Sequence, residues 1–161
     1  MELTHVDPSG AARMVDVSGK EVTTRAARAA GRLTTTAEVV ELLRTNSLAK
    51  GDAVAVARIA GIAAAKRTAE LIPLCHPLGL HAVEVDIELG PDYVDLVATT
   101  RTADRTGVEM EALTAVAVAG LALYDMIKAV DRAAVLGEVR LLAKSGGRSG
   151  AWSRDGSTVP E

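Results

Sequence analysis

A chain of 161 residues is long enough for one domain with its own core, and its single cysteine cannot form an internal disulfide. The net charge of −3 argues against a general nucleic-acid binder, and no Phe, two Tyr and one Trp leave no aromatic platform for single strands. The longest uncharged apolar stretch, residues 112–124, falls short of the roughly 18 residues that span a bilayer, and the first residues lack the basic and apolar regions of a secretory signal. We therefore expect a cytoplasmic protein with no nucleic-acid or membrane partner.

The N-terminal half predicts one strand followed by two helices. Residues 22–33 are expected to form the strand, with an alanine-rich helix as the alternative. The threonines that follow supply helix N-caps, with Glu38 in capping-box position for Thr35. One helix is expected over about residues 37–46 and a second over about 52–70. The second is apolar almost all round and has Gly61 among alanines, so another backbone can approach it closely.

The C-terminal half predicts a hairpin, a long helix and a last strand. Aliphatic and acidic side chains alternate over residues 81–89, a turn follows, and 93–101 return as the second strand. A third apolar helix is expected over about 108–130 and a strand over about 134–143. With the first two helices merged, the order is β-α-β-β-α-β, the split unit of an α+β, ferredoxin-like fold with an antiparallel sheet and helices on one face. We expect this single domain over residues 1–150 and a flexible tail over 151–161.

The two apolar helices also predict a homo-oligomer. One sheet covers only one side of each helix, so sister subunits would cover the other side. The alternative is that alanine is simply a favourable helix former in a chain of this composition.

Asp125 and Lys128 are the first candidates for chemistry, because they lie about one turn apart at the end of a helix whose preceding residues, 112–124, carry no charge. They form either a surface ion pair or an acid/base pair whose pKa values are tuned by desolvation and by each other. Glu109 and Glu111 begin the same helix, where carboxylates also complement the helix dipole. About 21 Å of helix separates Glu111 from Asp125, so a shared site needs a long substrate or a subunit interface.

His76 lies between Pro73 and Pro77, which give its ring a fixed direction. That direction suits a ligand contact or proton transfer, and capping of a helix backbone is equally open. The spacing of Cys75, His76 and His81 matches no zinc site, so we predict no structural metal.

Lysine is scarce in this chain, since only five of its 18 cations are lysines. Lys50 precedes a helix start and Lys144 precedes the SGGRSG segment at 145–150, where backbone amides favour anions. With Arg25 they are candidate phosphate contacts, although the segment is not a Walker loop and is a weak signal by itself.

Seven segments then carry a resemblance in chain order: LTH at 3–5, MVDV at 14–17, AKRT at 65–68, LIPLCHPL at 71–78, TGVEMEALT at 106–114, YDMIKAV at 124–130 and KSGGRSG at 144–150. Together they cover roughly residues 3–150 and closely resemble the cyclic pyranopterin monophosphate synthase (MoaC) family of molybdenum cofactor biosynthesis.

The resemblance implies a ferredoxin-like lyase that assembles as a hexamer, a trimer of dimers with active sites at the dimer interface. It implies conversion of 3′,8-cyclo-7,8-dihydroguanosine 5′-triphosphate into cyclic pyranopterin monophosphate, with release of pyrophosphate. No cofactor is expected, although magnesium could accompany the triphosphate. The alternative is a non-catalytic, ferredoxin-like nucleotide-binding oligomer.

The resemblance also implies roles for particular residues. Asp125 matches the catalytic acid/base, with Lys128 as its partner, and Arg148 stands where relatives often have Lys. The substrate-binding set comprises Leu74, Cys75, His76, Glu109 and Met110, with Glu111 beside them, and the cations suited to the triphosphate, Lys50, Lys144 and Arg25.

Overall fold

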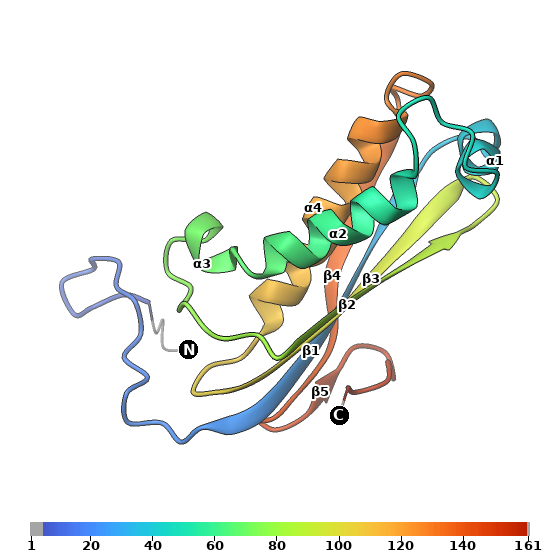
Figure 1. Cartoon of the computed structure of the whole chain (residues 1–161). Helices are drawn as coiled ribbons and strands as arrows, with labels where there is room; N and C mark the ends of the chain where they lie inside the picture. The colour runs from blue at the N-terminus through green and yellow to red at the C-terminus, as the bar shows by residue number, and fades with distance from the viewer. Residues whose placement is uncertain (1–4, 161) are drawn as a thin grey trace.

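The computed structural model describes residues 5–160 as an α+β fold in which helices cover one face of a sheet (Figure 1). The elements in chain order are β1 (Thr23–Thr34), α1 (Ala37–Arg44), α2 (Ala53–Ala65), α3 (Thr68–Leu71), β2 (Ala82–Leu89), β3 (Tyr93–Asp104), α4 (Glu109–Ile127), β4 (Val135–Ser145) and β5 (Trp152–Ser153).

The sheet has the strand order β2-β3-β1-β4-β5, and every neighbouring pair is antiparallel. β1 lies at the centre, paired with β3 over its whole length from Thr23↔Asp104 to Thr34↔Tyr93. The α+β class predicted from the sequence is confirmed, and the order of the first four strands is consistent with a ferredoxin-like arrangement.

Small side chains let α2 and α4 pack closely together over the sheet. A Cβ at Gly61 would lie 2.8 Å from the carbonyl oxygen of Ala115 and 3.1 Å from the Cβ of Ala119. Glycine is therefore required there, as the alanine-rich sequence indicates.

α4 is the one described helix with the length and apolarity of a membrane span, but half of that stretch is buried and it packs on β1, β3 and β4. Those contacts are those of a core helix.

One predicted boundary and one predicted capping box are wrong. The second helix does not continue to residue 70: α2 ends at Ala65, and α3 begins after a break at Lys66 and Arg67, where the buried hydroxyl of Thr68 donates to the Ala65 carbonyl, 2.9 Å away. The N-cap of α1 is Thr36, which accepts from the Val39 amide, so the capping box with Thr35 does not form. The Thr35 hydroxyl instead donates to Asp131, 2.8 Å away, and this long-range contact could not be read from local spacing.

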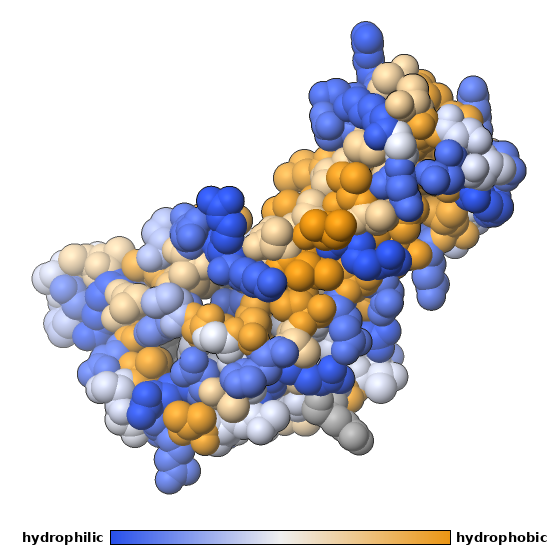
Figure 2. Space-filling view, viewed as in Figure 1, coloured by the Kyte–Doolittle hydropathy of each residue, from blue (hydrophilic) through white to orange (hydrophobic). Residues whose placement is uncertain are grey.

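The outer sides of the long helices carry exposed aliphatic residues. Figure 2 shows hydrophobic surface gathered over the region of α2 and α4, between more hydrophilic ends of the molecule. Val56 and Ile59 of α2 are 44% and 67% exposed, and Leu121 of α4 is 58% exposed. One sheet therefore does not cover both sides of these helices, as the sequence predicts.

The C-terminal segment folds back on β4. Trp152 and Ser153 form β5, with Ala143↔Ser153 in register, and the Ser145 hydroxyl donates to the carbonyl of buried Pro160 over 2.6 Å. The flexibility expected for residues 151–161 stays a prediction.

Candidate functional site

The predicted site residues form two groups at opposite ends of α4. Glu109 opens this helix and Asp125 lies in its last turn. Sixteen residues of helix separate them, which is about 24 Å along the axis. The wide separation inferred from the sequence is therefore confirmed. The two groups of one chain cannot both contact the same small part of a substrate.

The group at the C-terminal end of α4 is a carboxylate held by two lysines. Lys128 Nζ lies 2.6 Å from Asp125 Oδ1, and Lys50 Nζ lies 3.0 Å from Asp125 Oδ2. Lys50 also donates to the Asp125 carbonyl oxygen over 2.6 Å. It reaches this place from the loop before α2, whose N-cap is Asp52. Lys50 thus belongs with Asp125 and does not lie with Lys144 and Arg25, with which sequence reasoning had grouped it.

Ion pairing controls the charge of this group. Hydrogen bonds from Lys128 and Lys50 hold the pKa of Asp125 below its ordinary value, and Asp125 in turn raises the pKa of Lys128. The three side chains are about half exposed, at 57%, 51% and 43% for Asp125, Lys128 and Lys50. The desolvation expected for an acid/base pair is therefore absent in the single chain, where water screens these charges.

The group at the N-terminal end of α4 encloses a pocket of about 250 Å³, here called the histidine pocket. One wall is the loop after α3, held by its prolines, and the other is the first turn of α4. The residues that line it are His5, Leu74, Cys75, His76, Leu78, Thr106, Gly107, Glu109, Met110 and Glu111. All six residues that the sequence assigns to substrate binding in these two segments therefore meet in one place.

Protonation in the histidine pocket is governed by burial. Glu111 is only 4% exposed, and burial, with a contribution from Glu109, raises its pKa to about 7. Burial likewise raises the pKa of the Cys75 thiol. His76 Nε2 lies 2.6 Å from the Val15 carbonyl oxygen, which can only accept, so Nε2 carries a proton and Nδ1 is the acceptor in the neutral ring. The pocket thus holds a carboxyl group that can gain or lose a proton near neutral pH.

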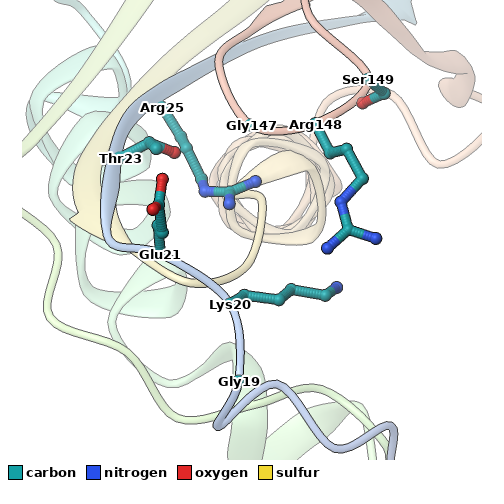
Figure 3. A pocket seen from close by; sticks show the side chains of 8 residues that line it. All are labelled: Gly19, Lys20, Glu21, Thr23, Arg25, Gly147, Arg148 and Ser149. Carbon is teal, nitrogen blue, oxygen red and sulfur yellow. The ribbon is translucent and has the colours of Figure 1, made fainter.

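A second, larger hollow of about 690 Å³ lies beside β1 and the glycine-rich segment after β4. Figure 3 shows the side chains of Lys20, Arg25 and Arg148 extending into the same space, which we call the cationic hollow. Arg25 is fixed by donating to the carbonyl oxygens of Asp104 and Arg105, at 2.9 and 3.2 Å. Sequence reasoning missed Lys20, although the scarcity of lysine was a signal that could have found it.

Lys144 connects the hollow to the histidine pocket. Its ammonium lies 3.6 Å from Glu109 Oε1 and also hydrogen-bonds the hydroxyl of Ser149, which lines the hollow. Glycine is required next to it, because Gly146 and Gly147 have φ values of +88° and +71°, and a Cβ at Gly147 would collide with the Arg25 guanidinium. The two cavities are therefore neighbours that share a charged wall.

The MoaC family model matches residues 14–147 of the chain, which is more than half of it. The chain belongs to the MoaC family. Proteins named cyclic pyranopterin monophosphate synthase are similar to it over nearly its full length. The Streptomyces avermitilis protein is 61% identical over 94% of this chain and 89% of its own length. The Nocardioides protein is 61% identical over 94% and 95%. Cyclic pyranopterin monophosphate synthase 2 of Mycobacterium tuberculosis is 59% identical over 95% and 92%.

The family resemblance predicted from the sequence motifs is thus confirmed. Within this MoaC-family chain, the structure brings seven of the predicted residues to the histidine pocket or its wall and places Arg25 in the adjoining hollow. It sets Asp125, Lys128 and Lys50 apart at the far end of α4.

Proposed function

We propose that this protein converts 3′,8-cyclo-7,8-dihydroguanosine 5′-triphosphate into cyclic pyranopterin monophosphate and releases pyrophosphate. The observation that carries the proposal is the junction between the histidine pocket and the cationic hollow through Glu109 and Lys144. A ring system fits the first cavity and a chain of phosphates fits the second. The names of the relatives, and membership of the MoaC family, support the same reaction.

The chemistry needs proton transfers and one phosphoryl transfer. Rings open and reclose as protons move, and Glu111, with a pKa near 7, can exchange a proton in the histidine pocket at neutral pH. A sugar hydroxyl then attacks the α-phosphorus of the triphosphate. The new O–P bond forms, the hydroxyl loses its proton, and the bond between the α-phosphorus and the leaving pyrophosphate breaks. Lys20, Arg25 and Arg148 extend into the space where they would balance the charge of the leaving pyrophosphate.

We assign Asp125, Lys128 and Lys50 to the site of a neighbouring copy. The 24 Å of helix between the two groups, estimated from the helix rise, prevents one chain from using both on one small centre. The half-exposed ion-paired group also lacks the dry surroundings that acid/base catalysis needs, and a second subunit would provide them. The exposed Val56, Ile59 and Leu121 support a homo-oligomer, which we propose to be a hexamer built as a trimer of dimers.

We further propose that the protein acts in the cytoplasm and needs no resident metal, with magnesium accompanying only the triphosphate. Proton transfer and phosphoryl transfer can be carried by the titratable groups and cations already described. Chelation followed by dialysis should then leave an enzyme that magnesium alone restores. A requirement for zinc or iron would contradict this proposal.

The test is turnover of the cyclised nucleotide, prepared enzymatically, by the purified full-length protein. Pyrophosphate release and formation of the pyranopterin, followed by mass spectrometry, should rise together in equal amounts. Uncyclised GTP is the matched control and should release no pyrophosphate. Binding of the cyclised nucleotide without either product would contradict the enzymatic function and favour a nucleotide-binding oligomer.

A further inference from the structure

The N-terminal segment over residues 5–20, here called the strap, runs past both cavities of the site. His5 lines the histidine pocket at one end, and Gly19 and Lys20 line the cationic hollow at the other. Between them, the Val15 carbonyl accepts the hydrogen bond from His76. In Figure 1 the strap lies at the end of the molecule where the loop after α3 also lies. A segment that precedes the whole sheet in sequence is therefore part of the wall of the site.

The position of His5 is fixed by a folded turn. The Arg13 amide donates to the His5 carbonyl over 2.9 Å, and Val6 and Ala12 form an antiparallel bridge. At the tip, Asp7 Oδ1 accepts from the amides of Ser9 and Ala11 at 2.8 and 2.9 Å. His5 is thus presented to the pocket by a structured loop.

The imidazole of His5 has no structural task of its own. Within residues 5–160, its side chain has no hydrogen-bond or ion-pair partner, whereas His76 already donates a hydrogen bond from Nε2 to the Val15 carbonyl. Of the described residues that line the pocket, only these two histidines carry an aromatic ring. The chain has no Phe, and Tyr93, Tyr124 and Trp152 lie in other parts of the fold. A flat heterocycle in this pocket therefore finds its ring contact and a free nitrogen on His5.

We propose that His5 is a further substrate-contacting residue, which covers the histidine pocket and binds the purine-derived ring system of the substrate by stacking or by a hydrogen bond. The identity of the ring rests on the proposed function. The contact itself rests on the strap, the pocket and the unpartnered imidazole. Because His5 would contact the ring and not the bonds that form and break, it should act mainly on substrate affinity.

Steady-state kinetics of His5→Ala test the contact, with His81→Ala as the matched control. His81 is exposed, and its ring nitrogen accepts from the Ala103 amide outside both cavities. His5→Ala should raise KM about tenfold, the size of one lost ring contact, and leave kcat nearly unchanged. His5→Gln keeps a hydrogen-bonding group. If the contact is a hydrogen bond, the KM of His5→Gln should lie between those of wild type and His5→Ala. Values of kcat/KM within about twofold of wild type for His5→Ala would overturn the proposal.

Chemical footprinting separates this inference from the proposed function. Diethyl pyrocarbonate modification of Asp125→Asn protein is mapped by mass spectrometry with and without the cyclised nucleotide. The nucleotide should protect His5 and leave His81 fully reactive. If the nucleotide protects His5 but the wild-type protein never turns it over, the contact stands and the proposed reaction fails. If turnover occurs and His5 reacts equally fast in both samples, the contact fails and the reaction stands.

Discussion

Asp125 and Glu111 are carboxyl groups on the same helix, yet the protein moves their pKa values in opposite directions. At the C-terminal end of α4, two lysines contact an exposed carboxylate and keep it ionised. At the N-terminal end, burial favours the neutral form of Glu111 and brings its pKa to about 7. The pKa of Asp125 is therefore set mainly by its lysine partners, and the pKa of Glu111 mainly by desolvation.

The difference has a consequence for the chemistry. In the single chain, Asp125 remains an anion and Lys128 a cation at neutral pH, so neither exchanges protons readily there. Glu111 is close to half-protonated under the same conditions. If Asp125 and Lys128 are to act as acid and base, a second subunit or the substrate must remove water from them and bring their pKa values toward neutrality.

The largest effect is expected from Asp125→Asn. Removal of the carboxylate should lower kcat by about 10²–10⁴-fold, the usual contribution of a positioned acid or base. Because the carboxylate is half exposed in the single chain and its ion pairs are screened by water, thermal stability should change little, and the oligomer, held by the aliphatic helix faces, should stay intact. Glu41→Gln is the matched control, since Glu41 pairs with Arg44 in an exposed i,i+3 contact. Dissociation or unfolding of Asp125→Asn would show that the ion-paired group is structural.

Lys128→Arg tests whether charge alone is sufficient at this end of the helix. The substitution keeps the ion pair with Asp125 but replaces a tunable ammonium by a group that does not release its proton, so kcat should fall about tenfold or more. Turnover assays should compare it with Arg44→Lys, an exchange of the same kind in an exposed helical pair. A fully active Lys128→Arg protein would mean that only the positive charge is needed.

Mixed oligomers test whether the two ends of α4 belong to one active site. Asp125→Asn and His76→Ala proteins, each expected to be nearly inactive, are unfolded together in equal amounts and refolded. If each site takes one end from each copy, half of the dimers are mixed and each mixed dimer has one intact site, so about a quarter of wild-type turnover should return. Each variant refolded alone provides the baseline. Recovery of no activity by the mixture would contradict a site shared between copies, because a site built from one chain would carry a defect in every copy of the mixture.

The remaining effect is on stability, at the buried end of α4, and leaves turnover aside. The folded pKa of Glu111, about 7, lies above its ordinary value of 4.5, so between these values the folded state binds a proton that the unfolded state has lost. Relative to Glu111→Gln, the free energy of unfolding of the wild type should be highest below about pH 4.5. It should fall by roughly 1.4 kcal/mol per pH unit above that value and level off above about pH 7. Urea unfolding across this range measures the difference. Parallel pH profiles for the two proteins would show that Glu111 is not desolvated.

Much of this molecule could be predicted because its signals are local. The alternation of residues 81–89 predicts β2, and the long apolar run predicts α4, because each pattern has the period of the structure that it forms. The motifs at 71–78 and 106–114 likewise identify the two walls of the histidine pocket. Three neighbouring threonines compete for the N-cap of α1, so the sequence did not decide for Thr36 over Thr35. The contact of Thr35 with Asp131 and the break before α3 were missed, because both depend on packing between segments.

The sequence by itself determined the α+β class, the order of all elements except the short α3 and β5, the MoaC family and the separation of Glu111 from Asp125 along one helix. Only the tertiary structure decided which distant residues meet: Lys50 with Asp125, Lys144 with Glu109, and His5 with His76 at one pocket. It also decided the protonation of Glu111, because burial is a property of the packed chain. The hydrophobic periodicity of a segment indicates whether it forms a helix or a strand. Contacts between segments depend on sheet register and helix packing, which short-range patterns do not encode.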